Sequence, residues 1–184
     1  MNQKKKIFYY FFECSDPTVV VSLRHKIDLM EFTPEQQSAY LKATTICSRG
    51  ETCTFDIKEK LKKWELSEDD SMAVINLLKK EKYLDDERFA RAYVKDKFRF
   101  NQWGRTKIAY MLHSKSISRE IQEAAFEEID EEVYSEKLVK LLADKEKTIR
   151  VKDKLDKRNK LMRFAMGRGF ESNKVFAAFK EMGI

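Results

Sequence analysis

The sequence has few of the residues that make turns, bind metals or cross a membrane. Five Gly and two Pro among 184 residues are too few for the many turns of an all-β fold. Three Cys and two His lack the spacing of a zinc-binding site, so we expect no metal, and reduced thiols as in a cytoplasmic protein. No apolar run reaches the length of a membrane-spanning helix. Long runs with a helical apolar period instead predict an all-α fold.

The sequence also lacks the motifs of an enzyme. It has no glycine-rich phosphate loop, no Ser/His/Asp set in a suitable context and no group of metal ligands. The acidic residues at 127–132 follow one another along a helix and therefore point in different directions, which favours a solvated surface over a cation site. We expect no catalytic residues and no cofactor, and the chain is predicted not to be an enzyme.

Charge is abundant and unevenly distributed. Charged residues make up 37% of the chain, the net charge is +6 and the isoelectric point is about 9.1. Eight acidic residues and no basic ones lie at 120–136, whereas eight basic and two acidic residues lie at 87–115. This balance indicates an acidic partner such as a nucleic acid or a nucleoprotein. A moderately basic protein with a solvated surface remains the alternative.

Apolar positions recur about every fifty residues. The first set is Ile57, Leu61, Leu66, Ser67 and Ala73. A shift of 51 residues gives Ile108, Leu112, Ile117, Ser118 and Ala124, and 53 more give Leu161, Ala165, Phe170, Glu171 and Ala177. Four of the five positions are apolar in all three sets. A period of this length is typical of small helical units that bury their apolar faces by stacking on one another.

The period predicts three tandem three-helix repeats that form an elongated, curved body. We place them at residues 33–84, 85–130 and 131–184. Residues 1–29 differ in composition from the rest, with three Lys before a run of aromatic residues. We therefore expect 1–29 to be a disordered or non-native extension, with Met30 as the physiological start.

Capping residues predict where several helices begin. Thr33 followed by Pro34 opens a helix that runs to about residue 47, and Asp56 and Ser67 are expected to cap the next two. Ser118 is expected to cap the third helix of the second repeat. In the long helix that starts near residue 85, the expected inward residues are Phe89, Tyr93 and Phe100.

A basic ridge is the strongest candidate for a binding surface. It consists of Arg88, Arg91, Lys95 and Arg99, which the helical period places on one face. No acidic residue pairs with them along that face of their own helix. A row of cations on a helix whose apolar face packs on the core can bind phosphate oxygens or carboxylates. A solvated helix face is the alternative.

A second basic patch follows in the third repeat. It contains Lys152, Lys154, Lys157 and Arg158 within the charged stretch at 150–160. Such a run is most often a solvated helix, and contact with a nucleic-acid backbone is the other interpretation.

Three motifs of the second repeat resemble the RecX family of bacterial recombination regulators. They are YLDDERFARAYV at 83–94, WGRTKI at 103–108 and KSI at 115–117. Ser116 stands where that family usually has Gly, and Arg105 stands where it often has Pro. Weaker versions of the turn occur in the other repeats, and the resemblance covers residues 33–182.

The resemblance implies a function and a partner. RecX-like proteins bind the RecA recombinase filament on single-stranded DNA and inhibit its assembly, ATPase, strand exchange and co-protease activity. The implied setting is DNA repair, homologous recombination and the SOS response, and we expect a cytoplasmic monomer with no membrane contact. The expected contacts, to the filament or to DNA, are Arg88, Arg91, Lys95, Arg99, Arg105 and Lys107. The alternative function is a general basic helical protein that binds DNA or RNA directly.

Overall fold

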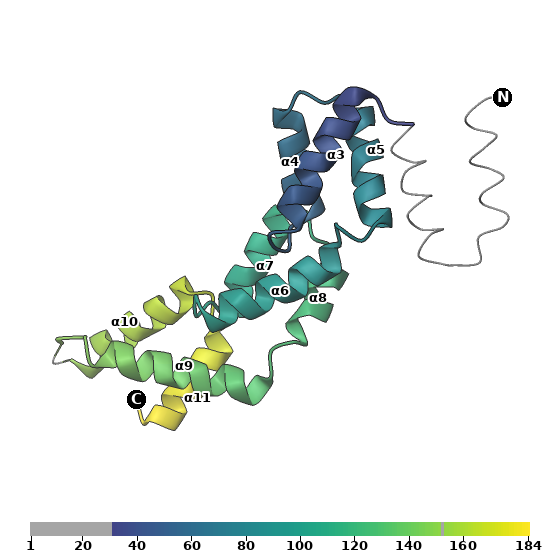
Figure 1. The fold of residues 1–184 in the computed structure, drawn as a ribbon. Helices are drawn as coiled ribbons and strands as arrows, with labels where there is room; N and C mark the ends of the chain where they lie inside the picture. The colour runs from purple at the N-terminus through teal and green to yellow at the C-terminus, as the bar shows by residue number, and fades with distance from the viewer. Residues whose placement is uncertain (1–30, 152) are drawn as a thin grey trace, which may run out of the picture. The chain divides into compact units, whose positions relative to one another are not determined.

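A computed structural model of the chain describes residues 31–151 and 153–184, and these residues form nine α-helices and no strand (Figure 1). The all-α prediction is confirmed. The helices belong to two compact units, of which the first ends at Asp85 and the second is Asp86–Ile184. The predicted extension at 1–29 lies outside the described residues. The curved arrangement of the repeats stays a prediction.

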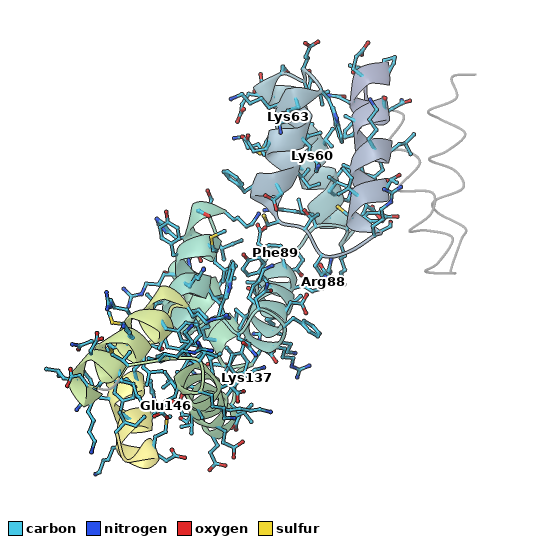
Figure 2. The ribbon with its side chains drawn as sticks, turned by 90° about the vertical axis from the view of Figure 1, so that its left-hand side faces the viewer. Lys60, Lys63, Arg88, Phe89, Lys137 and Glu146 are labelled. Carbon is cyan, nitrogen blue, oxygen red and sulfur yellow. The ribbon has the colours of Figure 1, made fainter. Side chains whose placement is uncertain are left out.

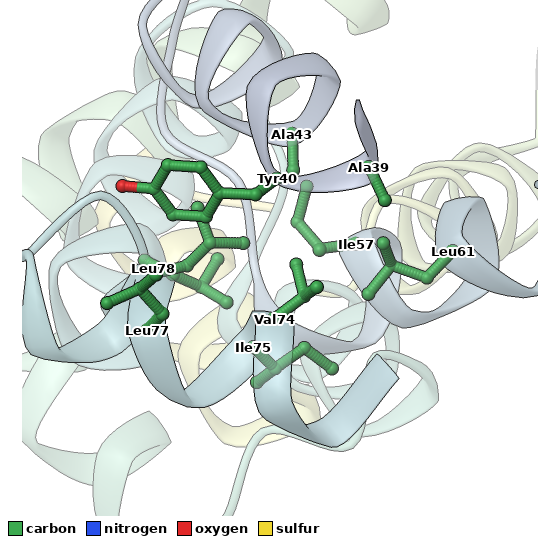
Figure 3. Packing of buried hydrophobic residues seen from close by; sticks show 10 residues of the cluster. Ala39, Tyr40, Ala43, Ile57, Leu61, Val74, Ile75, Leu77 and Leu78 are labelled. Carbon is green, nitrogen blue, oxygen red and sulfur yellow. The ribbon is translucent and has the colours of Figure 1, made fainter. Parts of the chain in front are cut away.

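The first unit is a trio of helices: α3 (Pro34–Cys47), α4 (Thr54–Lys63) and α5 (Glu68–Lys80). Helix α5 packs against both of the others. Their apolar stripes meet in one core, centred on the fully buried side chains of Tyr40, Ile57 and Leu78 (Figure 3). Loss of this apolar surface from water is the main contribution to the stability of the trio.

Two of the three predicted caps in this unit are confirmed. Thr33 and Gln36 form a complete capping box, and the Ser67 hydroxyl accepts the N–H of Asp70. The prediction for Asp56 is wrong, because α4 begins three residues earlier. Its N-cap is Cys53, which is fully buried and makes no side-chain capping bond. The helix thus begins at a buried side chain and not at the expected capping carboxylate.

The second unit contains six helices that pack as two trios (Figure 1). The first trio is α6 (Asp86–Arg99), α7 (Arg105–Ser114) and α8 (Arg119–Phe126). The second is α9 (Glu131–Glu146), α10 (Lys154–Gly167) and α11 (Ser172–Met182). Within them α6 packs mainly on α8, and α9 packs on α10 and α11.

The repeat seen in the sequence corresponds to one recurrent turn. Between the second and third helix of each trio, one residue adopts the left-handed conformation: Glu65 (φ 64°), Ser116 (φ 59°) and Gly169 (φ 89°). The next residue is a recurrent apolar position, and its N–H donates to a carbonyl five residues back, at 3.1–3.2 Å. Helix ends of this kind favour glycine. At positive φ, the Cβ of any other residue lies too close to the neighbouring backbone atoms.

We expect Ser116→Gly to stabilise the second unit by about 0.5–1 kcal/mol, because glycine adopts this φ without the Cβ clash of serine. The gain is net of the greater flexibility that glycine gives the unfolded chain. Urea unfolding followed by circular dichroism measures it. The control Ser114→Gly changes a helical residue two positions away and should lose stability instead. A Ser116→Gly variant no more stable than the parent contradicts the prediction.

Candidate partner-binding surface

Helix α6 carries the basic ridge and is anchored by its opposite face. Its buried side chains are Phe89, Ala90, Val94 and Phe98. The prediction for Phe89 is confirmed, and Tyr93 is half-buried, with its ring centre 5.5 Å from that of Phe89 and 5.0 Å from the Lys97 ammonium. The prediction for Phe100 is wrong: α6 ends at Arg99, and the Phe100 side chain beyond it is 78% exposed. On the ridge, Arg88, which Figure 2 labels, and Arg99 are exposed, whereas Arg91 and Lys95 are half-buried.

The half-buried ridge residues converge on one carboxylate. Glu128, in the turn after α8, lies 2.9 Å from Arg91 Nη1 and 2.8 Å from Lys95 Nζ. The hydrogen bonds from Lys95 and Arg91 lower the pKa of the Glu128 carboxyl. The sequence predicts that the acidic residues at 127–132 form a solvated surface. One of them, Glu128, instead pairs with the ridge within the molecule. Two of the four ridge cations join α6 to the end of α8.

Arg105 is also held within the molecule. Its guanidinium lies 2.9 Å from a Glu131 carboxylate oxygen and 4.3 Å from the centre of the Tyr134 ring. It also donates to the carbonyl of Ile129 at 3.4 Å, and its side chain is only 21% exposed. Lys174 pairs with the same Glu131 carboxylate. These bonds tie the start of α7 to α9 and α11.

Tyr134 lies at the centre of that junction. Its hydroxyl donates to Glu171 Oε2 at 2.5 Å and accepts the backbone N–H of Arg105 at 3.1 Å. Its fully buried ring packs between Phe98 and Phe170, with ring centres 5.5 and 5.2 Å away. Burial, and then the hydrogen bond to Glu171, raise the pKa of the phenol far above its ordinary value.

Two glycines bring the backbones of the two trios into direct contact. The N–H of Gly104 donates to the carbonyl of Arg168 at 2.9 Å, and that of Thr106 to the carbonyl of Gly169 at 3.0 Å. The first N–H groups of α7 thus find partners in the turn that follows α10. A Cβ at Gly104 would overlap the backbone of Gly169, and a Cβ at Gly169 would overlap Lys107.

Lys107, the last of the six predicted contact residues, lies beside an aromatic ring. Its ammonium is 4.5 Å from the centre of the Trp103 ring, and Lys97 approaches the same ring at 5.5 Å. The half-buried Trp103 therefore lies next to two cations. Of the predicted set, Arg88, Arg99 and Lys107 lie outside the ion pairs to Glu128 and Glu131.

The second basic patch is only partly available. Lys152 lies outside the described residues, and Lys154 is exposed at the start of α10. Lys157 pairs with Glu146 at 3.1 Å, and the Arg158 guanidinium lies 5.5 Å from the centre of the Phe179 ring. Two of its four residues thus contact neighbouring helices of the trio.

The sequence did not predict that Glu128, Glu131 and Tyr134 bind the basic residues of α6 and α7. A usable signal existed, because an acidic stretch at 120–136 follows closely on a basic one at 87–115. Opposite charges on consecutive helices of one repeat can pair across it. The pairing of Arg91 with Glu128 spans 37 residues and has no local motif.

The described residues contain neither a membrane-spanning helix nor a group of metal ligands. In 31–151 and 153–184, no helix has both the length and the hydropathy needed to cross a membrane. Within the same ranges, no three His, Cys, Asp or Glu side chains are grouped so as to hold a metal ion.

Comparison with known proteins gives a consistent set of matches. The family model described as "RecX, second three-helix domain" matches residues 85–125. The "Regulatory protein RecX" of Clostridium acetobutylicum is 30% identical over 169 residues, covering 89% of this chain and 77% of that protein. The protein of the same description from Clostridium perfringens (strain 13) is 32% identical over 118 residues, covering 63% of this chain and 55% of that protein.

Solved structures match the fold at lower identity. The crystal structure of RecX from Lactobacillus salivarius superposes with a TM-score of 0.71 at 22% identity, covering 81% of this chain and 97% of that one. A second structure, described as regulatory protein RecX, gives a TM-score of 0.73 at 20% identity, covering 96% of this chain and 85% of that one. At these identities the likeness shows the fold.

Proposed function

The chain belongs to the RecX family, and on this premise we propose that it binds the RecA filament on single-stranded DNA and inhibits it. The inhibited steps are filament assembly, ATP hydrolysis, strand exchange and co-protease activity. The observation that carries the proposal is the 30% identity to a RecX regulatory protein over 89% of the chain. The relatives are regulatory proteins by name, which agrees with the prediction that this chain is not an enzyme.

The described surface is compatible with this function. A basic ridge lies on a helix whose other face is buried, so it can meet a carboxylate-rich protein surface without loss of the core. The ridge and the RecX-like motif coincide at α6. The proposed contacts remain Arg88, Arg91, Lys95, Arg99, Arg105 and Lys107. Arg91 and Lys95 would have to exchange Glu128 for a partner group, whereas Arg99 is exposed and lies outside that ion pair.

The test is the ATPase activity of the cognate RecA protein on single-stranded DNA. We expect strong inhibition at amounts of this chain well below those of RecA, because a bound regulator can block growth of a whole filament. Inhibition only after all the DNA is coated supports the alternative of a general nucleic-acid-binding protein. No inhibition at any ratio contradicts the proposal.

The ridge itself is tested by a pair of variants. We expect the double variant Arg91→Gln/Lys95→Gln to need roughly tenfold more protein for half-inhibition, which corresponds to about 1.4 kcal/mol. The matched variant Glu128→Gln removes the shared partner and leaves both cations in place. We expect it to inhibit at least as well as the parent. Equal losses in both variants would show that the ion pairs hold the fold and that the ridge does not contact the filament.

A further inference from the structure

Six cations gather around the end of α6. This cation cluster consists of Lys97, Arg99, Lys107, Lys137, Lys140 and Arg168, contributed by α6, α7, α9 and the turn after α10. Lys137 Nζ donates to the carbonyl of Arg99 at 3.0 Å, and Arg168 Nη1 donates to the carbonyl of Asn101 at 3.0 Å. Lys97 and Lys107 lie over one ring, that of Trp103. Figure 2 marks Lys137 on α9.

The cation cluster has no acidic counterpart among the described residues. None of its six members lies within ion-pair distance of a carboxylate in the ranges 31–151 and 153–184. Nearby cations differ, since Arg91 and Lys95 share Glu128, and Arg105 pairs with Glu131. A carboxylate thus offsets the charge of those three cations, whereas the contacts of the cluster, to two carbonyls and to aromatic rings, leave its net positive charge in place.

Like charges crowd together within the cluster. Lys137 is half-buried, and its ammonium lies 4.6 Å from the centre of the Phe98 ring. Burial lowers the pKa of the Lys137 ammonium, and the charges of Arg99 and Lys140 lower it further. A bound anion would relieve that repulsion. The arrangement therefore favours a ligand that carries several negative charges.

Aromatic side chains accompany the cations. Phe100 follows Arg99 directly and is 78% exposed, with no role in the core. The half-buried Trp103 lies three residues further along the same turn. Exposed aromatic rings beside cations are typical of surfaces that bind single-stranded nucleic acid, where bases stack on rings and phosphates meet the cations. In a duplex the bases are already stacked and offer no face to Phe100.

We propose that the cation cluster and Phe100 form a binding surface for single-stranded nucleic acid. Arg99, Lys137 and Lys140 contact the phosphates, and one base stacks on Phe100. This inference goes beyond the proposed function and does not depend on it, because the contact is made by this chain alone. It also differs from the sequence prediction, which placed the contacts along α6 and at the start of α7, and which omitted Lys97, Lys137, Lys140, Arg168 and Phe100.

The test is fluorescence anisotropy of a labelled single-stranded oligothymidine, titrated with the full chain in the absence of RecA. We expect Lys137→Gln/Lys140→Gln to weaken binding about tenfold and to reduce the salt slope by about 1.4, that is about 0.7 for each lost phosphate contact. We expect Phe100→Ala to weaken binding by about tenfold with an unchanged salt slope, because it removes stacking and no charge.

The matched control is Lys60→Gln/Lys63→Gln, which removes the same charge from exposed positions of α4 (Figure 2). We expect it to bind nearly as well as the parent. Equal weakening in this control overturns the inference, since only net charge would then matter. Parent-like binding by the Lys137/Lys140 variant overturns it too. Tighter binding to a duplex of the same length, or binding to polyglutamate and not to the oligonucleotide, would assign the surface to another ligand.

Because RecA is absent, this assay is independent of the proposed function. Loss of oligonucleotide binding with intact inhibition of the RecA ATPase contradicts only the nucleic-acid surface. Intact binding without inhibition contradicts only the proposed regulation. Circular dichroism checks that each variant is folded, and Phe100→Ala is a safe second variant because its side chain is largely outside the core.

Discussion

Replacing Gly104 with alanine is expected to destabilise the second unit by about 3 kcal/mol or more. The added Cβ would overlap the carbonyl of Gly169 and the backbone N of Phe170. Backbone atoms cannot move aside as the end of a side chain can. Gly104 has a φ of −81°, which alanine adopts without strain. The expected loss of stability therefore comes from the overlap alone.

The loss should extend beyond one contact. Separating the two backbones also breaks the hydrogen bonds from Gly104 to Arg168 and from Thr106 to Gly169. The first N–H groups of α7 would then need water as their partner. For a unit of about 100 residues we expect Tm to fall by more than about 10 °C.

The measurement is thermal unfolding followed by Trp103 fluorescence, in a Trp64→Phe background so that only the second unit reports. The matched control is Gly167→Ala, at the last residue of α10, where an added Cβ has no atom within 4 Å. We expect this control to keep or slightly raise Tm, because alanine has the higher helix propensity. A Gly104→Ala protein with parental Tm contradicts the close approach of the two backbones.

Gly169→Ala provides a second test of the same contact from the other side. It combines overlap with Lys107 and a φ of 89°, which alanine rarely adopts. Its loss of stability should equal or exceed that of Gly104→Ala.

The fold was predictable from the sequence wherever the signal is local. The recurrent apolar positions Ile57, Ile108 and Leu161 are fully buried, as their period predicts. The caps at Thr33, Ser67 and Ser118 depend on bonds within three residues and are confirmed. Each cap is decided within one turn of helix, and each buried position by the apolar pattern of its own repeat.

The errors have a physical cause in common. A buried side chain competes with a good capping residue for the start of a helix, and Cys53 prevails over Asp56. The helical period predicted Phe100 as an inward residue, but the period ends where α6 ends, at Arg99. Both errors concern helix ends, where tertiary contacts decide between nearly equal alternatives.

The candidate site was harder to predict than the fold. The period correctly groups Arg88, Arg91, Lys95 and Arg99 on α6, but it contains no information on what faces them. The partner of Arg91 is 37 residues away, and the contact of Gly104 with Gly169 spans two trios. Pairing between distant helices follows from the packing of their buried faces. A single sequence therefore locates the cations without showing which are already paired.

Replacing Tyr134 with phenylalanine is expected to destabilise the second unit by about 1–3 kcal/mol at neutral pH. The ring remains, so the packing against Phe98 and Phe170 is kept. The hydroxyl is lost, and with it the bonds to Glu171 and to the N–H of Arg105. Glu171 and that N–H would be left beside an apolar ring edge. Urea unfolding at pH 7, with Trp103 as the probe, measures the difference.

The same variant changes how stability depends on alkaline pH. Folding raises the pKa of the Tyr134 phenol, chiefly through burial and next through Glu171, while Arg105 acts in the opposite direction. The stabilisation is complete below the unfolded pKa of about 10 and is lost as pH rises above it, because the unfolded phenol ionises first. The slope is about 1.4 kcal/mol per pH unit for one group. Tyr134→Phe removes this slope.

Comparison of parent and variant isolates the phenol from other groups that titrate in that range. Lys137, whose pKa is lowered, contributes with the opposite sign, but it is present in both proteins and cancels in the difference. We therefore expect the two stabilities to differ most at pH 7–9 and to converge between pH 10 and about 12. A constant difference across that range would show that the phenol ionises as easily in the folded unit as in the unfolded chain. Tyr134 would then not be the buried, Glu171-bonded centre of the junction.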